Sequence, residues 1–413
     1  MPTDFQTRFE RYAELAVKAW LNVQRGQRLA LVAPLEAAPL ARVISKYAYL
    51  NGSPFVQFLW NDSEAARIRF EFAPRDSWKE YPEEFALLAQ RALERGDALL
   101  SITAQDPDVL RGLDLEFVSR AQKVAAEKNK PVQDAVRRNQ VNWLGIGMPV
   151  PAWAKRVFPA LSEQDAVARL WDAIFYVCRV DEPDPVAAWR AHAADLGARR
   201  AILNQKQYTA LHFYGGETDL TVGLPQGHVW VGVTDTTPGG ITFVANAPTE
   251  EIFTLPHRER VDGVVTSSKP LSVRGNVIEK FVLTFQGGRV VQIRANQHRD
   301  VLEKLLMTDD GAARLGEVAL VPHSSPVSKL GLFFYNPLFD ENAASHLALG
   351  SCYAQCLQGG VEMSDQELTA HGANDSLVHL DFMVGSDQIN VDGIGADDTR
   401  EPVMRAGEWA FAT

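Results

Sequence analysis

The chain has 413 residues, of which 46% are apolar and 23% are charged, and its formal net charge is −11. A single hydrophobic core rarely supports more than about 250–300 residues, so we expect two domains. The composition is that of a globular protein and excludes a disordered or fibrous chain. The negative charge, without a dense Lys/Arg cluster to offset it, predicts no nucleic-acid partner and no membrane partner.

Features of the N-terminus and of the cysteines predict a cytoplasmic protein. Met1 leads directly into an amphipathic segment, without the basic and apolar regions of a signal peptide. No apolar run approaches the roughly 18–20 residues that span a bilayer. The three cysteines are an odd and sparse set, which favours reduced thiols over a disulfide framework.

The first 185 or so residues alternate helical and strand patterns. Apolar residues recur at helical spacing from Phe5 to Trp20. The patterns then predict, in order, a strand at 29–33, a helix at 36–50, a strand at 54–60, a helix at 85–95, a strand at 98–104, a helix at 113–128 and a strand at 141–146. This alternation predicts an α/β domain over residues 1–185, with a mostly parallel sheet and helices on both faces.

An α/β domain of this kind invites a search for a nucleotide site. The turn after the first strand, Pro34-Leu35-Glu36, has a carboxylate where a pyrophosphate would lie. The Gly145-Ile146-Gly147 segment continues into Met148-Pro149 without a third glycine. Neither turn has the glycine-rich form that binds phosphates, so the sequence disfavours a nucleotide site.

From Tyr208 onward the pattern changes to short alternating segments separated by glycine-rich turns. Two helices, at 162–177 and 185–203, precede this change. The segments predict strands at 210–213, 219–222, 229–233, 241–244, 281–285 and 290–294, with helices near 300–307 and 341–355. Hairpin turns join antiparallel strands. We therefore expect an α+β, largely antiparallel domain over residues 186–413.

The histidines indicate where chemistry would occur. All nine follow residue 190, so the second domain is the expected catalytic and metal-binding domain. The helical zinc-protease motif, with two histidines four residues apart and a glutamate between them, is absent. Any metal site must therefore be assembled from segments that are distant in sequence.

Two of the candidate segments contribute glutamates. Glu250 and Glu251 lie between a turn and an apolar strand, so that one of them can point inward. A solvated acidic pair is the alternative. Glu317 opens an apolar strand directly after Gly316, which permits close backbone approach. A carboxylate there is costly to bury unless it is paired or bound to a metal.

Two further segments contribute histidines. His346 and Tyr353 are seven residues apart on the predicted helix and would share a face, although a core histidine is the alternative. His379 and Asp381 are two apart in a predicted strand and so project from the same side, opposite Leu380 and Phe382. This pair is the strongest signal for metal ligands.

Together these segments predict a hydrolase with two metal ions. Three or more carboxylates and two imidazoles suit Zn, Co or Mn, and the carboxylates suffice to bridge two ions. Cys352 and Cys356 are four apart on the predicted helix; core packing is favoured over a thiolate metal pair, because cysteine is among the most buried residue types.

At the same segments the sequence resembles the aminopeptidase T family, also called peptidase family M29. The resemblance extends over essentially the whole chain. It is carried by the segments Asp184–Trp189, Thr218–Leu224, Pro248–Phe253, His257–Val261, Leu315–Pro322, Leu338–His346 and Val378–Asp381.

The resemblance implies a homodimer of two-domain subunits that releases N-terminal residues from peptides with broad specificity. It implies two divalent metal ions per subunit, with Zn, Co, Mn and Mg as candidates, and substrates with a free N-terminus. The implied metal ligands are Glu251, Glu317, His346, His379 and Asp381, with Glu341 and Tyr353 lining the site.

Catalytic roles follow as hypotheses from this set. Glu250 or Glu341 would carry a proton from water to the leaving amine, and Tyr353 would donate a hydrogen bond to the developing oxyanion. Two other functions stay open at this point. One is a dinuclear amidohydrolase acting on a non-peptide amide. The other is a non-enzymatic protein that binds solutes or peptides on its α/β domain.

Overall fold

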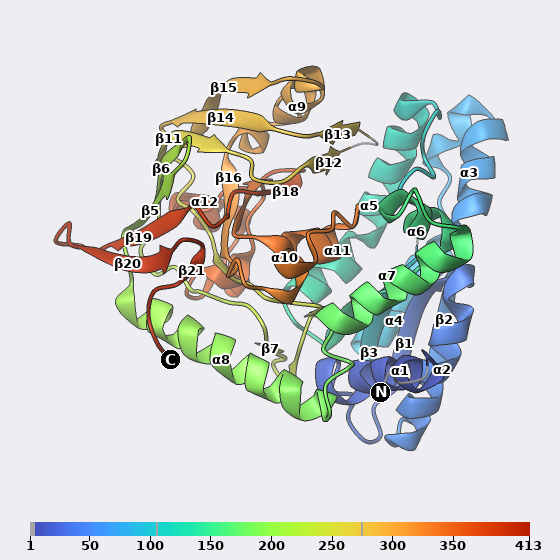
Figure 1. The fold of residues 1–413 in the computed structure, drawn as a ribbon. Helices are drawn as coiled ribbons and strands as arrows, with labels where there is room; N and C mark the ends of the chain where they lie inside the picture. The colour runs from blue at the N-terminus through green and yellow to red at the C-terminus, as the bar shows by residue number, and fades with distance from the viewer. Residues whose placement is uncertain (1–4, 105, 274–275) are drawn as a thin grey trace. The chain divides into compact units, whose positions relative to one another are not determined.

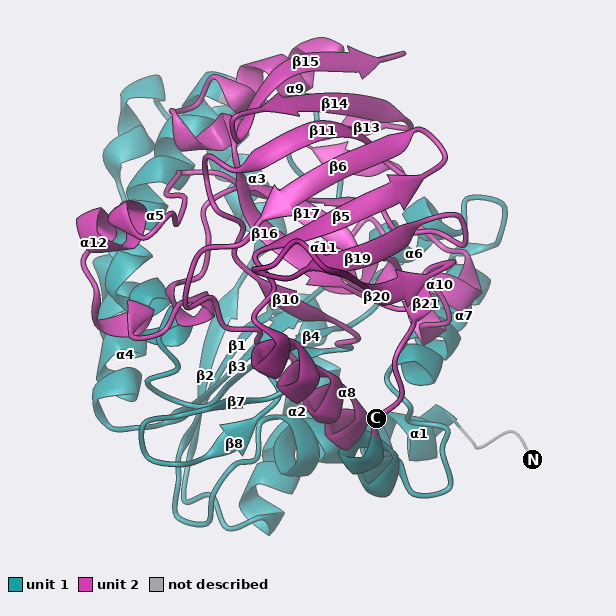
Figure 2. Ribbon diagram, turned by 90° about the vertical axis from the view of Figure 1, so that its left-hand side faces the viewer, with its two compact units in different colours: residues 1–191, 234–248 teal, residues 192–233, 249–413 magenta. Residues whose placement is uncertain are grey.

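The computed structural model describes residues 5–104, 106–273 and 276–413 and contains two compact units. The first unit comprises residues 1–191 and 234–248, and the second comprises residues 192–233 and 249–413 (Figure 2). The sequence pattern suggests a single division at 185/186 and does not reveal that 234–248 returns to the first unit. The reason for the return is β9 (Asn246–Ala247), which adds a strand to the sheet of that unit.

The first unit is built on a five-stranded parallel sheet (Figure 1). Its strand order is β2-β1-β3-β4-β9, and every neighbouring pair is parallel. The strands that precede β9 are β1 (Leu29–Pro34), β2 (Val56–Asn61), β3 (Ala98–Thr103) and β4 (Trp143–Gly147). Five of the six residues of β1 are buried, as expected for a central parallel strand. The predicted α/β architecture with a parallel sheet is confirmed.

Most predicted helices of this part of the chain are confirmed. They are α1 (Phe5–Leu15), which continues as a π turn at Ala16–Trp20, α2 (Ala38–Leu50), α4 (Glu83–Glu94), α5 (Leu115–Arg137), α7 (Glu163–Val177) and α8 (Pro185–Lys206). Two helices, α3 (Ser63–Phe72) and α6 (Pro151–Val157), were not predicted from the sequence. Since α3 buries none of its residues, it has no apolar stripe to detect. Among the described residues, no helix has both the length and the apolar character needed to cross a bilayer.

The second unit contains an antiparallel sheet of eight strands in the order β15-β14-β11-β6-β5-β19-β20-β21 (Figure 1). The strands are β5 (Ala210–Gly215), β6 (Thr218–Gly223), β11 (Val261–Thr266), β14 (Phe281–Gln286), β15 (Arg289–Ala295), β19 (Asn390–Ile394), β20 (Arg400–Arg405) and β21 (Glu408–Trp409). The predicted antiparallel character of this domain is confirmed, as is the helix α9 (Arg299–Leu306).

A second antiparallel sheet, of four strands, lies in the same unit. Its order is β10 (Ile252–Thr254), β16 (Leu315–Leu320), β17 (His346–Gly350) and β18 (His379–Met383). Side chains from one face of this sheet join the core that the eight-stranded sheet also lines: Val318, Leu320, Leu347, Leu349 and Phe382. Because successive side chains of a strand alternate between faces, the other face is left for polar residues.

Two predicted elements are wrong, and a third is shorter than predicted. The segment 341–355 is a 3₁₀ turn (Glu341–Ala343), the strand β17 and a second 3₁₀ turn (Ala354–Cys356), so His346 and Tyr353 do not share a helix face, nor do Cys352 and Cys356 share a helix. Its small residues suit a helix, but pairing with β16 and β18 overrides that propensity. The segment 229–233 forms no strand and makes one isolated bridge, between Val231 and Phe253, and Val233 has a positive φ of 59°. The expected strand at 241–244 is only the two-residue β8 (Thr242–Phe243).

Candidate metal centre

The five potential metal ligands all lie on the four-stranded sheet or at its edge. Glu251 directly precedes β10, Glu317 is in β16, His346 begins β17, and β18 carries His379 and Asp381. Since these strands are neighbours in the order β10-β16-β17-β18, the sheet brings together four segments spread over 130 or so residues of sequence.

The register puts four of these side chains on one face. Glu317 and Asp381 both pair with Ala348, one from each side of β17. His346 precedes Ala348 by two residues, and His379 pairs with Gly350, two residues after Ala348. Paired residues of antiparallel strands project from the same face, as do residues two apart. The centre of this face is therefore occupied by alanine and glycine, which leaves room between the polar side chains.

A bulge at Gly316 turns Glu317 toward this face. The pairing with β17 shifts between Leu315 and Glu317, leaving Gly316 as the extra residue. A Cβ atom at this glycine would lie 2.3 Å from the carbonyl oxygens of Gly350 and Ser351. The close backbone approach expected from the sequence is thus present, and it excludes any larger residue at position 316.

The polar atoms form two groups that share Glu317. Nε2 of His346 lies 3.2 Å from Oε2 of Glu251 and 3.3 Å from Oε1 of Glu317. Nε2 of His379 lies 3.4 Å from Oδ1 of Asp381 and 3.9 Å from Oε2 of Glu317. Within each group, one potential ligand atom per residue lies within 4.8 Å of the others.

The two imidazoles are oriented in the same way. Nδ1 of His346 lies 3.2 Å from the carbonyl oxygen of Ala344, and Nδ1 of His379 lies 2.8 Å from that of Ser351. A proton on each Nδ1 donates to these carbonyls, so Nε2 is the atom directed at the carboxylates. Histidines that bind metals are commonly oriented by such a bond from the second ring nitrogen.

The electrostatics of the cluster favour added positive charge. Burial raises the pKa of Glu317 and raises that of Glu341 well above its usual range, with the Glu251 and Asp381 charges adding to the effect at Glu341. Burial opposes protonation of both imidazoles, yet the neighbouring carboxylates raise the pKa of His379 to about 10 and that of His346 well above its ordinary value. The carboxylates thus outweigh the desolvation of two cations.

The surroundings of two carboxylate oxygens indicate whether the residues suit a metal ion. Oε2 of Glu251 and Oδ1 of Asp381 are buried, and apart from the imidazole Nε2 atoms at 3.2 and 3.4 Å neither meets a hydrogen-bond donor among the described residues. Buried polar atoms without partners are uncommon and call for an explanation, such as a bound ion. Carboxylates mixed with imidazoles suit Zn, Co or Mn. The residues therefore fit divalent metal ions.

The remaining candidates lie around this cluster. Glu341, in the 3₁₀ turn before β17, belongs to neither group but interacts with Glu251 and Asp381. The ring of Tyr353 is 5.2 Å from that of His379 and 5.7 Å from that of Phe253, measured between centroids. The same carboxylates, together with burial, raise the pKa of Tyr353, so its hydroxyl keeps its proton.

Glu250 has a different environment from Glu251. Its side chain is buried with an oxygen 3.7 Å from Nε2 of His192, and its backbone N–H donates to Oδ1 of Asn342. Sequence reasoning missed both partners. His192 lies in an otherwise unremarkable helix and Asn342 in a segment predicted as helical, so no local pattern distinguishes them.

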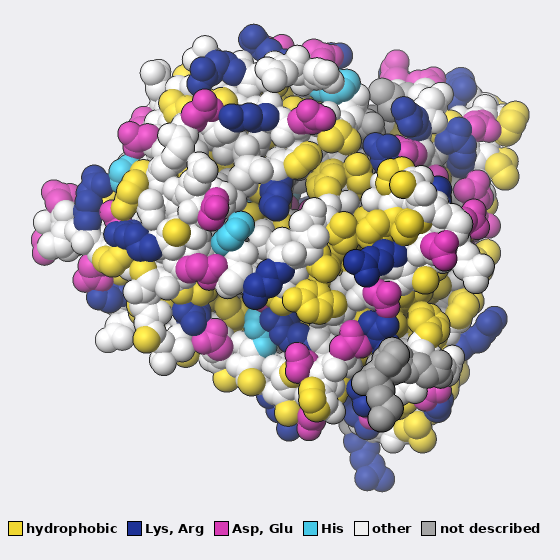
Figure 3. All heavy atoms as spheres, in the orientation of Figure 1, with side chains coloured by type: hydrophobic (Ala, Val, Ile, Leu, Met, Phe, Trp, Pro, Cys, Tyr) yellow, Lys and Arg dark blue, Asp and Glu magenta, His cyan; other side chains and the backbone are white. Residues whose placement is uncertain are grey.

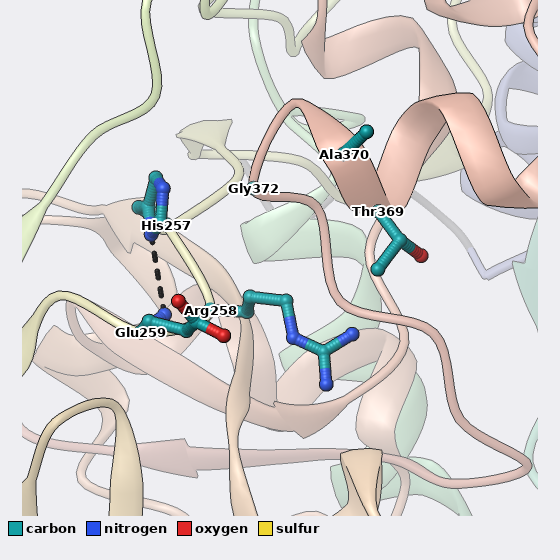
Figure 4. A pocket seen from close by; sticks show the side chains of 6 residues that line it. All are labelled: His257, Arg258, Glu259, Thr369, Ala370 and Gly372. Atoms are coloured by element: carbon teal, nitrogen blue, oxygen red, sulfur yellow. Dashed lines mark hydrogen bonds between the residues drawn. The ribbon is translucent and has the colours of Figure 1, made fainter.

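A polar cavity of about 350 Å³ lies elsewhere in the second unit (Figure 4). Its lining residues are His257, Arg258, Glu259, Thr369, Ala370 and Gly372. Figure 4 shows the Glu259 backbone N–H bonded to the ring of His257, with Arg258 extending beside them. None of the candidate ligands is among the described residues that line it, so this cavity is not the metal centre.

Comparisons with known proteins bear on the whole chain. Residues 5–409 match the family described as thermophilic metalloprotease (M29). Aminopeptidase 2 of Geobacillus stearothermophilus is 47% identical over 98% of both chains, and aminopeptidase T of Thermus thermophilus is 44% identical over 98% of this chain and 99% of its own. A structure described as wild-type AmpT from Thermus thermophilus superposes with a TM-score of 0.94 at 43% identity, covering 99% of this chain and 100% of its own. The chain therefore belongs to the thermophilic metalloprotease family M29.

Proposed function

We propose that the second unit binds two divalent metal ions and that the chain uses them to release N-terminal residues from peptides. The broader statement, that the chain is a metal-dependent aminopeptidase, rests on its family and on relatives named aminopeptidases. The observation that carries the dinuclear proposal is the pair of ligand groups that share Glu317.

Each ion has three protein ligands in this proposal. Glu251, Glu317 and His346 would hold one ion, and Glu317, His379 and Asp381 would hold the other. With Glu341, four carboxylates carry up to four negative charges around two neutral imidazoles, which two divalent cations would balance. Zn, Co, Mn and Mg stay candidates, because a set of nitrogen and oxygen ligands accepts several of them.

Bound divalent ions would polarise the scissile carbonyl and lower the pKa of an attacking water. Glu341 accepts a proton from that water and delivers it to the leaving nitrogen. Its place beside Glu251 and Asp381, outside both ligand groups, supports this role. Glu250, the alternative, is buried beside His192 and so has less support. Tyr353 donates its hydroxyl proton as a hydrogen bond to the developing oxyanion.

The expected substrate, partners and cellular location follow from the proposed aminopeptidase function. The expected substrates are peptides with a free N-terminus. On the face drawn in Figure 3, Lys/Arg and Asp/Glu side chains are interspersed, and with a net charge of −11 this supports a protein without a nucleic-acid partner. We also propose a cytoplasmic homodimer in which the second unit is the catalytic domain.

The test is hydrolysis of leucyl- and arginyl-p-nitroanilide by the purified protein. Activity should disappear on chelation and return with Co, Zn or Mn. N-acetyl-leucyl-p-nitroanilide is the matched control, because it blocks the free amine that an aminopeptidase requires. Cleavage of the acetylated substrate alone would indicate an amidohydrolase. Peptide binding that survives complete chelation, without turnover, would indicate a binding protein.

A further inference from the structure

We propose that two buried asparagines, Asn342 and Asn374, are positioning residues that each serve one half of the metal centre. Both side chains are almost completely buried, at 0% and 2% exposure. Each bonds to backbone next to a different ligand group. The inference rests on the proposed dinuclear site and adds that the two halves are held independently.

Asn342 holds the segment that carries Glu251. Residues 248–251 precede β10 and belong to no strand, so no sheet ladder fixes their backbone. Oδ1 of Asn342 accepts the N–H of Glu250 at 2.7 Å, and Nε2 of His192 lies 2.8 Å from the carbonyl oxygen of Thr249. The peptide between Thr249 and Glu250 is therefore bonded at both its N–H and its C=O, which fixes the backbone one residue before Glu251 and so limits where that side chain can point.

Asn374 holds the segment that orients His379. Its Nδ2 donates to the carbonyl oxygens of Gly350 at 2.6 Å and Gly311 at 2.9 Å, and its backbone carbonyl oxygen accepts the N–H of Cys352. These bonds enclose Ser351, whose carbonyl oxygen is the partner of Nδ1 of His379. A shift of Ser351 would therefore rotate the imidazole in the other ligand group.

The atoms with which the two asparagines hold the ligand segments are opposite in kind, although Nδ2 of Asn342 also donates to the carbonyl oxygen of Leu338 at 3.1 Å. Asn342 acts on Glu250 through an acceptor, whereas Asn374 acts on Gly350 and Gly311 through donors. An aspartate keeps the acceptor and loses the donors. Asn342→Asp should thus preserve the contact to Glu250, and Asn374→Asp should lose both contacts. The same Asn→Asp substitution should therefore preserve the contact at position 342 and remove it at position 374. A general loss of packing would not produce this difference between the two positions.

The experiment is a calorimetric Co²⁺ titration of the metal-free full-length chain, with bound cobalt counted by elemental analysis. The wild type should bind two ions, and Asn342→Ala and Asn374→Ala should each weaken one of the two binding steps about 10- to 100-fold, as for other residues that orient ligands. Asn342→Asp should restore binding, and Asn374→Asp should not. Ser325→Ala is the matched control, because Ser325 is buried and donates to the backbone of Asn342 without contacting Glu250.

Double-mutant cycles assign each weakened step to one half. The effect of Asn342→Ala should disappear in a Glu251→Gln background and persist in Asp381→Asn, with the reverse pattern for Asn374→Ala.

Equal weakening of both steps, or the same pattern in Ser325→Ala, would overturn the inference. If an alanine variant does not fold, the aspartate pair decides: equal binding by both Asp variants would also reject it. A wild type that binds fewer than two ions would instead reject the proposed dinuclear site.

Discussion

At the scale of single residues, the centre depends on which atom of each side chain is left available. Both imidazoles use Nδ1 on a backbone carbonyl and direct Nε2 at carboxylates. Two buried carboxylate oxygens meet no hydrogen-bond donor among the described residues other than these imidazoles. The orientation of each imidazole and the surroundings of each carboxylate oxygen determine which atoms could bind a metal ion. Neither can be read from the residue types in the sequence.

Tyr353→Phe should keep both metal ions and lower kcat by about 100- to 1,000-fold, the usual effect of removing one donor to an oxyanion. The phenyl ring retains the contacts with Phe253 and His379, so the site should remain assembled. The measurements are kcat and KM on leucyl-p-nitroanilide, with metal content as the control. Turnover at the wild-type rate would reject the role given to the hydroxyl.

Asp309→Asn should destabilise the loop that leads into β18. Asp309 accepts hydrogen bonds from the backbone N–H groups of Ala312 and Leu377 and from the hydroxyl of Ser376. Burial opposes ionisation, but these donors prevail and lower the pKa of Asp309. The substitution should cost about 1–2 kcal/mol at pH 7, because one charge-assisted acceptor becomes a donor.

The pH dependence of this loss has a defined sign. A lowered folded-state pKa contributes stability above the unfolded value, near 3.9, and that contribution is lost as the pH falls through the folded value. Urea unfolding of both metal-free proteins from pH 7 to pH 3 should show midpoints that converge below about pH 4. A difference that stays constant across this range would contradict the assignment.

At the scale of elements, the four-stranded sheet separates core from chemistry by its two faces. Leu347 and Leu349 of β17 join the apolar core, whereas Ala348 lies between Glu317 and Asp381 on the other face. The strand thus contributes both packing and space. The small side chain at position 348 leaves the space between Glu317 and Asp381 that a metal ion would need.

Ala348→Leu should abolish binding of at least one ion, because the added side chain would occupy the space between Glu317 and Asp381. Overpacking of this kind also costs about 1–3 kcal/mol of stability. Leu349→Met is the matched control: it lies on the opposite face and nearly conserves volume, so it should retain both ions. Elemental analysis after gel filtration measures the difference. Two ions bound to Ala348→Leu would refute the assignment of this face.

At the scale of the whole molecule, all the proposed ligands belong to the second unit. Metal binding to the folded state stabilises it by about 2.7 kcal/mol per site at a free concentration 100 times Kd. Chelation should therefore reduce hydrogen-exchange protection in β16, β17 and β18 and leave β1 of the first unit unchanged. Glu317→Gln, which removes the shared ligand, is the control in which chelation should have little effect. Equal loss in both units would contradict the proposal.

Much of the architecture could be predicted because it depends on local patterns. Buried parallel strands are continuous apolar runs, and amphipathic helices repeat at their own spacing, so the order of elements in the first unit was accessible. The alternation of His379 and Asp381 with Leu380 and Phe382 likewise predicted a strand with one polar face, which is what β18 forms. A helix without a buried apolar face, such as α3, could not be predicted from such a pattern.

The sequence by itself determined the fold class of each half, the residue types available for a metal centre and the strand that carries two of them. Only the tertiary structure decided that 346–350 forms a strand, that 234–248 belongs with the first unit and that Asn342 and Asn374 bond beside the candidate ligands. The physical reason is the range of the interactions. Hydrophobic periodicity involves residues that are close in sequence, whereas strand pairing and buried hydrogen bonds join residues that only folding brings together.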